Sequence, residues 1–118
     1  KYLGAPTQIN TMYRNYKSSD MKKGREFNLT RDQFYKLTQG NCYYCGSATS
    51  LYIWNSKYFG NKPFYKNGID RVDSNIGHIP ENCVSCCVIC NRAKNNMTTE
   101  DFLSWVDKLI NFRKLHNE

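Results

Sequence analysis

Basic and aromatic side chains interleave over residues 11–23, near the start of the chain, and we expect a basic helix there. The helix leads into Gly24, a residue type that commonly follows the last turn of a helix. Residues 1–10 show no periodicity and contain Gly4 and Pro6, so we expect an extended arm there.

A capping motif predicts a second helix. Thr30 is followed three residues later by Gln33, which is the arrangement of a capping box. Phe34 and Leu37 then supply an apolar stripe, and Gly40 ends the segment.

The middle of the chain predicts short strands. Residues 51–54, part of 57–66 and residues 69–72 are rich in aromatic and β-branched side chains. Asn67–Gly68 is a pair typical of a tight turn.

Two further helices are expected after these strands. The segment 80–82 suits a helix start, and we interpret 83–94 as a helix that runs through a group of cysteines. Thr98 is an N-cap for the last helix, whose apolar residues from Phe102 to Ile110 follow 3–4 spacing. We expect that helix to pack on the core.

The composition indicates a small, basic domain. The 118 residues suffice for one domain, and contents of 40% hydrophobic and 14% aromatic residues exclude disorder along the whole chain. No apolar run approaches the ~18 residues that a membrane helix needs, and no secretory signal is visible. We therefore expect an intracellular, reducing compartment, no membrane contact and no secretion, with a phage or an organelle as a conceivable source.

The net charge of +7 is distributed unevenly, because the first forty residues hold eight basic and three acidic side chains. Lysines and arginines gain affinity for nucleic acid by releasing condensed counterions, although a solvated helix surface explains such a run equally well. Tyr13 and Tyr16 alternate with Arg14 and Lys17. This pattern fits phosphate contact with base stacking, and it also fits the apolar side of a helix.

The cysteines predict a metal site. Cys42 and Cys45 form one C-x-x-C pair, and Cys87 and Cys90 form another. Two residues between cysteines let both thiolates face one ion, and two such pairs complete a tetrahedron around zinc. Four thiolates leave no position open for water, so the expected zinc is structural.

Spacing alone leaves the zinc ligands ambiguous. Cys83 and Cys86 form a further C-x-x-C pair, which competes with Cys87 and Cys90. We expect the two cysteines outside the site to be small buried apolar side chains. Disulfides are the alternative for all six cysteines, and the repeated C-x-x-C pairs without a secretory signal disfavour them.

Residues 41–97 resemble the HNH endonucleases, a family with the ββα-metal fold. The family pattern is C-x-x-C, Asp-His on a strand, a glycine-containing loop, an Asn, and C-x-x-C followed by His or Asn and a nearby Lys. The corresponding residues here are Cys42, Cys45, Asp70, Arg71, Gly77, Asn82, Cys87, Cys90, Asn91 and Lys94. The resemblance assigns Cys87 and Cys90 as the second zinc pair.

The resemblance also implies an α+β fold class, with a small zinc-stabilised ββα-metal core between N-terminal and C-terminal helices. Within one compact domain, we expect a basic arm and helices over 1–40 and the HNH-like core over 41–97. A packing helix follows over 98–118.

By the same resemblance, Asp70 and Asn91 are the ligands of a catalytic Mg²⁺ or Mn²⁺, and Asn82 braces the loop that carries the base. Arg71 departs from the family, because it stands where the family has the His that acts as general base. An arginine stays charged and accepts no proton, so we expect it to bind phosphate or to stabilise charge in the transition state. An ion pair with Asp73 or Glu81 is the alternative.

His78 is the histidine inside the motif, seven residues after the position of the family's base. It is the candidate proton acceptor, and a surface loop residue without function is the alternative. Other conceivable acceptors are Tyr43, Tyr44, Tyr65 and Asp73.

The function expected from this resemblance is metal-dependent hydrolysis of DNA phosphodiester bonds. The alternatives are a degenerate HNH domain that binds nucleic acid or joins a ribonucleoprotein assembly, and a zinc-stabilised interaction module without nucleic-acid contact. The expected partner is double-stranded DNA, and cleavage of both strands allows a homodimer or a larger assembly. Candidate contacts to nucleic acid are Arg14, Lys17, Lys22, Lys23, Arg25, Arg92 and Lys94.

Overall fold

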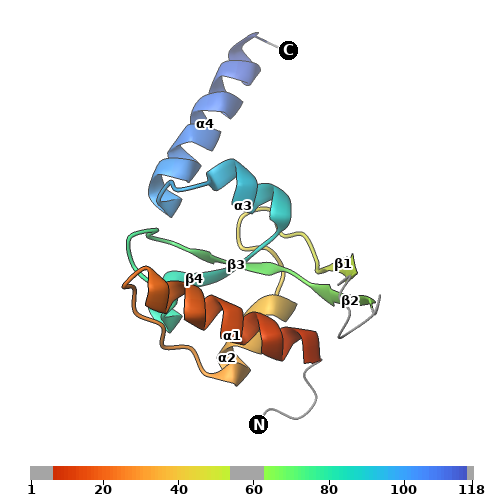
Figure 1. Ribbon diagram of the computed structural model, residues 1–118. Coiled ribbons are helices and arrows are strands. Elements are labelled where there is room, and N and C mark those ends of the chain that lie inside the picture. Colours follow the sequence, from red (N-terminus) through yellow and green to blue (C-terminus); the bar gives the residue numbers. More distant parts are fainter. Residues whose placement is uncertain (1–6, 54–62, 117–118) are drawn as a thin grey trace.

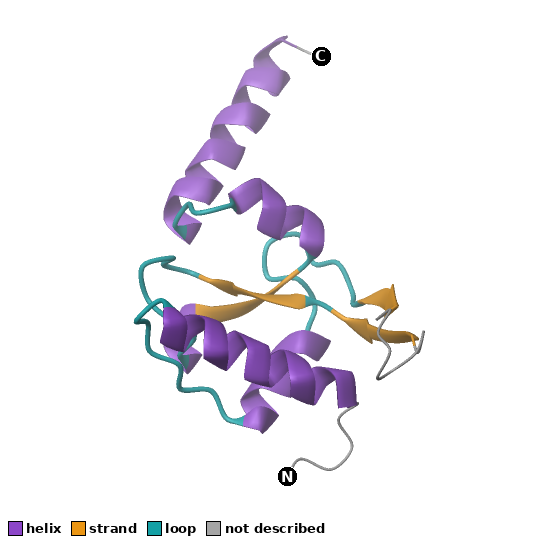
Figure 2. Ribbon diagram, viewed as in Figure 1, coloured by secondary structure: helices purple, strands orange, loops and turns teal. Residues whose placement is uncertain are grey.

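The computed structural model describes residues 7–53 and 63–116, and it contains four helices and two small antiparallel sheets in that part of the chain. The helices are α1 (Thr7–Lys22), α2 (Arg31–Gln39), α3 (Val88–Lys94) and α4 (Thr99–His116). The strands are β1 (Ser50–Ile53), β2 (Pro63–Lys66), β3 (Gly68–Arg71) and β4 (Cys83–Cys86), with a short 3₁₀ turn over Pro80–Asn82. Figure 2 shows the two sheets among the helices.

The first two helices, α1 and α2, largely agree with the helices predicted from the sequence. In the capping box of α2, the Gln33 backbone N–H donates to Thr30 Oγ1 at 3.1 Å, and the Thr30 N–H donates to Gln33 Oε1 at 2.9 Å. Gly24 adopts a φ of +71° just after α1, as the helix end required. The extended arm is wrong for residues 7–10, where α1 already begins, and residues 1–6 lie outside the described part of the chain.

The expected tight turn at Asn67–Gly68 is wrong, because β2 and β3 follow each other with one residue between them. Asn67 is buried, and its side-chain amide donates to the carbonyls of Gly40 at 2.9 Å and Ser47 at 3.3 Å. The residue therefore ties the strands to the end of α2 and to the first cysteine turn.

The helix expected over 83–94 is also wrong in its first part. Residues 83–86 form β4, which pairs with β3 in the register Gly68↔Cys86 and Asp70↔Val84. Cys87 keeps an extended backbone and caps α3 with its own sulfur, which accepts from the Cys90 N–H at 3.4 Å. Helix geometry is therefore delayed until Val88, and β3, β4 and α3 together make a ββα unit.

The sheet of β3 and β4 lies in the middle of the molecule, with α1 and α2 on one side and α3 on the other (Figure 1). Side chains from α1, α2 and β3 meet in the core, which includes Ile9, Met12, Phe34 and Ile69. Tyr13 and Tyr16 pack edge-on against Phe34 with ring centroids 5.4 and 5.1 Å apart. These tyrosines therefore belong to the apolar side of α1. The helices and the two separate antiparallel sheets together confirm the expected α+β class.

The last helix differs from its expected packing role. Thr98 caps α4, since its Oγ1 accepts from the Asp101 N–H at 3.1 Å. Phe102 is the buried residue of α4, and Figure 1 shows the helix running away from the ββα unit. Its other large apolar side chains are exposed, among them Leu103, Trp105, Leu109 and Phe112.

No helix of the described residues is long and apolar enough to cross a membrane.

Candidate active site and metal centre

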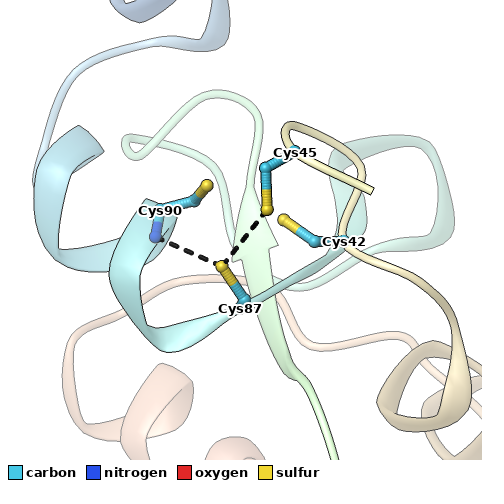
Figure 3. A group of neighbouring side chains, drawn as sticks. All are labelled: Cys42, Cys45, Cys87 and Cys90. Carbon is cyan, nitrogen blue, oxygen red and sulfur yellow. Dashed lines mark hydrogen bonds between the residues drawn. The ribbon is translucent and has the colours of Figure 1, made fainter. Parts of the chain in front are cut away.

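Four cysteines from two distant segments converge on one point (Figure 3). Cys42 and Cys45 lie in the turn between α2 and β1, while Cys87 and Cys90 lie at the start of α3. Their sulfur atoms all lie within 4.8 Å of one another, and the Cys45 and Cys87 sulfurs are 3.7 Å apart. The expected four-cysteine cluster is confirmed.

The cluster has the dimensions that zinc requires. A tetrahedral ion with bonds of about 2.3 Å needs sulfur atoms roughly 3.8 Å apart, which is close to the observed spacing. Hydrogen bonds from the Ser47 side chain and backbone lower the pKa of Cys45 to about 6, which favours the thiolate that a metal binds. Gly46 follows with a φ of +79°, so the turn uses a backbone conformation that suits glycine.

The two remaining cysteines are buried, as expected. Cys83 and Cys86 lie on β4 with exposed fractions of 9% and 1%, and burial raises the pKa of each thiol to about 12. All six cysteines are free thiols, so the disulfide alternative is wrong.

A pocket of about 540 Å³ opens between α1 and the ββα unit. Asp70 and Arg71 from β3, His78 from the following loop and Asn91 from α3 all line it. Basic side chains join them from both sides, namely Lys23, Arg25 and Arg92. The structure thus brings together four of the five residues that the sequence suggested as catalytic candidates, and Asn82 does not line the pocket.

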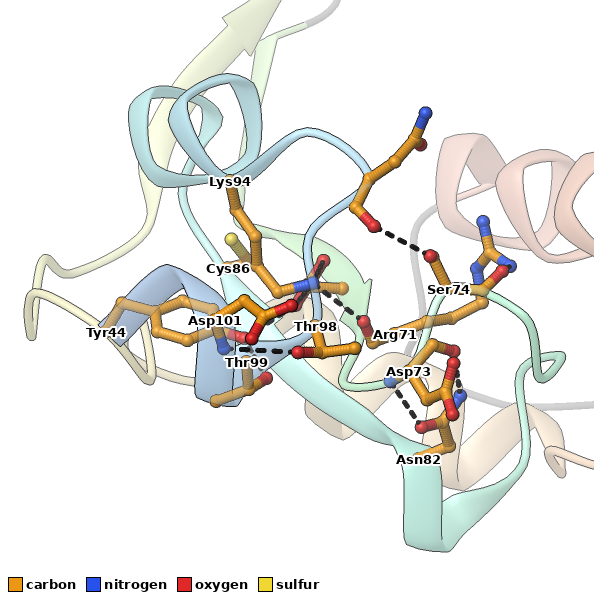
Figure 4. Close-up of polar contacts among 12 residues, drawn as sticks. Tyr44, Arg71, Asp73, Ser74, Asn82, Cys86, Lys94, Thr98, Thr99 and Asp101 are labelled. Carbon is orange, nitrogen blue, oxygen red and sulfur yellow. Dashed lines mark hydrogen bonds and ion pairs between the residues drawn. The ribbon is translucent and has the colours of Figure 1, made fainter. Parts of the chain in front are cut away.

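Asp70 is largely buried and belongs to a polar network around the end of α3, in which Figure 4 labels Tyr44, Arg71 and Lys94. Its Oδ2 accepts from the Tyr44 hydroxyl at 2.7 Å and lies 3.2 Å from Lys94 Nζ, which also donates to Oδ1 at 3.3 Å. Lys94 is fully buried and also donates to the Arg71 carbonyl at 3.0 Å. The prediction that Lys94 contacts nucleic acid is therefore wrong, because its charge is directed inward to Asp70.

Arg71 holds the loop that follows β3. Its Nη1 donates to the carbonyls of Ser74 and Ile76, the latter at 3.2 Å. No ion pair among the described residues joins Arg71 to Asp73 or Glu81, so that alternative is wrong. Arg71 nevertheless lines the pocket.

His78 is buried at the pocket wall, so its interpretation as a surface loop residue is wrong. Its Nδ1 lies 2.8 Å from Asp20 Oδ2, and its backbone N–H donates to the same oxygen at 2.9 Å. Arg25 Nε donates to the other Asp20 oxygen at 3.3 Å. The three contacts fix a fully buried carboxylate beside the imidazole.

Two residues hold the loop that carries His78. The Asn82 amide donates to the carbonyls of Asp73, Ile76 and Gly77 at 3.0–3.2 Å, and its oxygen accepts from the Asp73 N–H at 2.9 Å. Gly77 passes so close to the backbone of Glu26 that a β-carbon there would overlap the Glu26 carbonyl. A side chain at Gly77 would push the loop, and with it His78, away from the segment that follows α1.

The basic residues expected to contact nucleic acid divide into two groups on the flanks of α1. Lys23 and Arg25 line the pocket of Asp70, together with Arg92. Arg14, Lys17 and Lys22 line a separate open groove of about 650 Å³ with Arg31. Arg31 lies 4.5 Å over the Tyr13 ring and adds a cation that the sequence did not single out.

The sequence also missed Asp20, Tyr44 and Lys94 as parts of polar networks at the site. Asp20 and His78 are 58 residues apart, and no spacing rule connects an acid inside a basic helix with a distant loop. Tyr44, one of the conceivable proton acceptors, lies between the first two cysteines. Burial and the bond to Asp70, opposed by a hydrogen bond from Thr99, raise the Tyr44 pKa well above its ordinary value.

Comparison with known proteins agrees with this architecture. The fold is similar to that of PacI, described as a rare-cutting HNH restriction endonuclease that perturbs DNA, with a TM-score of 0.58 and 23% identity. The match covers 86% of this chain and 77% of PacI. The resemblance of the sequence to HNH endonucleases is thereby confirmed in the fold.

A second comparison gives a sequence relative. An uncharacterized protein of Acanthamoeba polyphaga mimivirus is 38% identical over 104 residues, which is 88% of this chain. The chain spans 17% of the length of that viral protein. No protein-family model matches the chain.

Proposed function

We propose that the chain is a metal-dependent endonuclease of the HNH type that hydrolyses phosphodiester bonds of double-stranded DNA. One observation carries the proposal: Asp70 and Arg71 from β3 line a single pocket with Asn91 from α3, and this pocket has a basic rim. The fold shared with an HNH restriction endonuclease supports the same reaction.

The donor set around this pocket fits a hard divalent ion. Asp70 offers about four lone pairs, of which Tyr44 and Lys94 use three, so one remains on Oδ1. Asn91 is exposed at the same pocket and offers an amide oxygen. Carboxylate and amide oxygens suit Mg²⁺ or Mn²⁺. A bound ion would steady the negative charge of the scissile phosphate and of the leaving oxygen.

The side chains around the ion site have complementary tasks. Arg71 binds a phosphate oxygen at the pocket wall, and Lys23 and Arg92 hold the neighbouring backbone of the DNA. Asn82 keeps the loop after β3 in place through its four hydrogen bonds. Lys94 orients Asp70 from the buried side, where water has no access.

The direct test is cleavage of a supercoiled plasmid by the zinc-loaded protein. We expect nicked or linear product with Mg²⁺ or Mn²⁺ and none in their absence. Folded, zinc-loaded protein that binds DNA and leaves it intact with either ion would contradict the proposal.

That contrary outcome would support a second candidate function, a degenerate HNH domain that binds nucleic acid or joins a ribonucleoprotein assembly. The observation in its favour is the Lys94 ammonium, which already neutralises Asp70 from 3.2 Å away. Arg71 also favours a domain that does not cleave, because an arginine stands at the position of the family's general base and accepts no proton.

Both functions predict salt-dependent binding through the open groove on α1. Removing three of its four cations should weaken DNA binding and lower the slope of log K against log salt by about 0.9 for each phosphate that the protein no longer neutralises. The variant combines three alanine substitutions, at Arg14, Lys17 and Lys22. Fluorescence anisotropy at several salt concentrations measures the slope.

A control variant with the same loss of charge separates location from net charge. It carries alanine at three exposed lysines outside the groove, Lys36, Lys108 and Lys114. An equal decrease of the slope in both variants would show that the groove is no special binding surface.

We also infer a reducing intracellular compartment, because the zinc cluster requires four reduced cysteines. The similarity to a mimivirus protein favours a viral source. Double-strand cleavage by this chain would require a homodimer or two successive events.

A further inference from the structure

A buried carboxylate–imidazole pair lies at the edge of the pocket, outside the proposed ion site. Asp20 comes from the last turns of α1 and is fully buried, and His78 comes from the loop after β3. Two contacts of 2.8 and 2.9 Å join Asp20 Oδ2 to the ring Nδ1 and to the backbone N–H of His78. A carboxylate buried so completely, with its imidazole at a pocket wall, suggests a role in the reaction.

The geometry selects one tautomer of the imidazole. An ionised carboxylate only accepts hydrogen bonds, so the His78 nitrogen that faces Asp20 must carry the proton. In the neutral ring the second nitrogen, Nε2, then has the free lone pair. Asp20 thus holds the ring in the form in which Nε2 can accept a proton.

The surroundings keep this ring neutral at physiological pH. Burial lowers the pKa of His78 below its ordinary value, and the charges of Arg71 and Arg25 act in the same direction, while Asp20 acts against them. The rings of Tyr16 and Phe27 pack on the imidazole at 5.1 and 6.2 Å. Burial also opposes ionisation of Asp20, but hydrogen bonds from His78 outweigh it and lower the pKa of that carboxyl.

The other candidate acceptors are less suitable. Tyr44 is hydrogen-bonded to Asp70 and Thr99, and its raised pKa makes it a donor. Tyr43 and Tyr65 are exposed on other parts of the surface, and Asp73 accepts from the Asn75 N–H. Of the residues lining the pocket, Tyr16 has a pKa raised by burial, and Asp70 is bound to Lys94.

We propose that Asp20 is a positioning residue that makes His78 the general base. His78, from the loop after β3, takes the role of the family's histidine, whose position on β3 is occupied by Arg71. This proposal rests on the proposed nuclease function. In the hydrolysis step, a water proton moves to His78 Nε2 while the water oxygen bonds to phosphorus. The bond from phosphorus to the leaving sugar oxygen breaks, and that oxygen takes a proton from solvent.

The first test needs no catalysis, because it reads the imidazole in the folded, zinc-loaded protein. A long-range ¹H–¹⁵N correlation spectrum should show His78 with a protonated Nδ1 and an unprotonated Nε2 at pH 7. The chain's other histidine, His116, is assigned from a His116→Ala sample. A His78 proton on Nε2, or a doubly protonated ring at pH 7, would overturn the proposal.

The second test removes the base and replaces it from solution. His78→Ala should slow plasmid cleavage by about 10²- to 10⁴-fold, and added imidazole should restore part of the rate. His116→Ala should cleave like the wild type. A folded His78→Ala protein that cleaves at the wild-type rate would overturn the assignment of the base, whereas a wild type that never cleaves would overturn the nuclease function itself.

The third test separates positioning from a merely structural role. The wild-type rate should rise with pH through the lowered pKa of His78 and level off above about 6.5, where the ring is neutral. Asp20→Asn removes the charge that favours imidazolium, so the acid limb should move to lower pH. The plateau should fall by about 10- to 100-fold, because the amide no longer enforces the tautomer. A lower plateau with an unmoved acid limb would overturn the positioning role of Asp20.

Discussion

Removing zinc from the four-cysteine cluster will unfold the ββα unit at room temperature. The cluster joins the turn before β1, through Cys42 and Cys45, to the start of α3, through Cys87 and Cys90. In small domains of this kind the free energy of zinc binding, about 10 kcal/mol or more, is free energy of folding. A domain of this size has few other sources of comparable stability.

Chelation followed by circular dichroism and a thermal melt measures this effect. We expect about one zinc per chain before chelation and loss of the cooperative melt afterwards. Cys87→Ser should behave like the chelated protein. A thermal midpoint that strong chelator leaves unchanged would contradict a structural role for the metal.

The buried cysteines of β4 supply the matched control. Cys83 and Cys86 lie close to the cluster in sequence, and neither belongs to it. Alanine at either position should keep the zinc and lower the free energy of unfolding by about 1 kcal/mol, as an ordinary buried substitution does. Zinc loss from Cys86→Ala would mean that the ligand set is misassigned.

Replacing Asn91 by alanine will nearly abolish DNA cleavage while the protein stays folded. Asn91 is exposed at the pocket, and its loss removes one proposed ligand of the catalytic ion without opening the core. Several kcal/mol of transition-state stabilisation correspond to roughly 10²- to 10³-fold in rate. Asn111→Ala, the same substitution on the exposed face of α4, should leave the rate unchanged.

The other proposed ligand, Asp70, requires a more careful design because it also stabilises the fold. Asp70→Asn leaves the Lys94 ammonium buried without its partner, which costs about 3–5 kcal/mol in such pairs. Reduced activity in that variant would therefore mix unfolding with impaired chemistry.

A double variant separates the two effects. Asp70→Asn combined with Lys94→Met removes both charges, so much of the stability should return. Cleavage should not return, since the carboxylate ligand is still missing. Recovery of cleavage together with stability would show that Asp70 acts only through the fold.

The sequence predicted the parts of this fold that rest on local rules. The Thr30–Gln33 capping box, the glycine after α1 and the C-x-x-C pairs each depend on a few neighbouring residues, and the structure confirms them. The family pattern also anticipated that Asp70 and Asn91 share a pocket.

Where the sequence misled, distant contacts decided the outcome. Asn67 is buried as a bridge between two other segments, although its pairing with glycine suggested a turn. The strand over 83–86 is fixed by its ladder with β3, which local periodicity does not reveal. Neither the inward ion pair of Lys94 nor the pairing of Asp20 with His78 has a sequence signature.

A crystal structure of zinc-loaded protein soaked in Mn²⁺ would show whether Asp70 and Asn91 hold the ion of the proposed nuclease reaction. Anomalous data at the zinc and manganese edges distinguish the two sites. We expect zinc among the four sulfurs, and manganese about 2.1 Å from oxygens of Asp70 and Asn91. A manganese map without a peak there, with Asp70 still bound only to Lys94 and Tyr44, would show that these residues hold no catalytic ion.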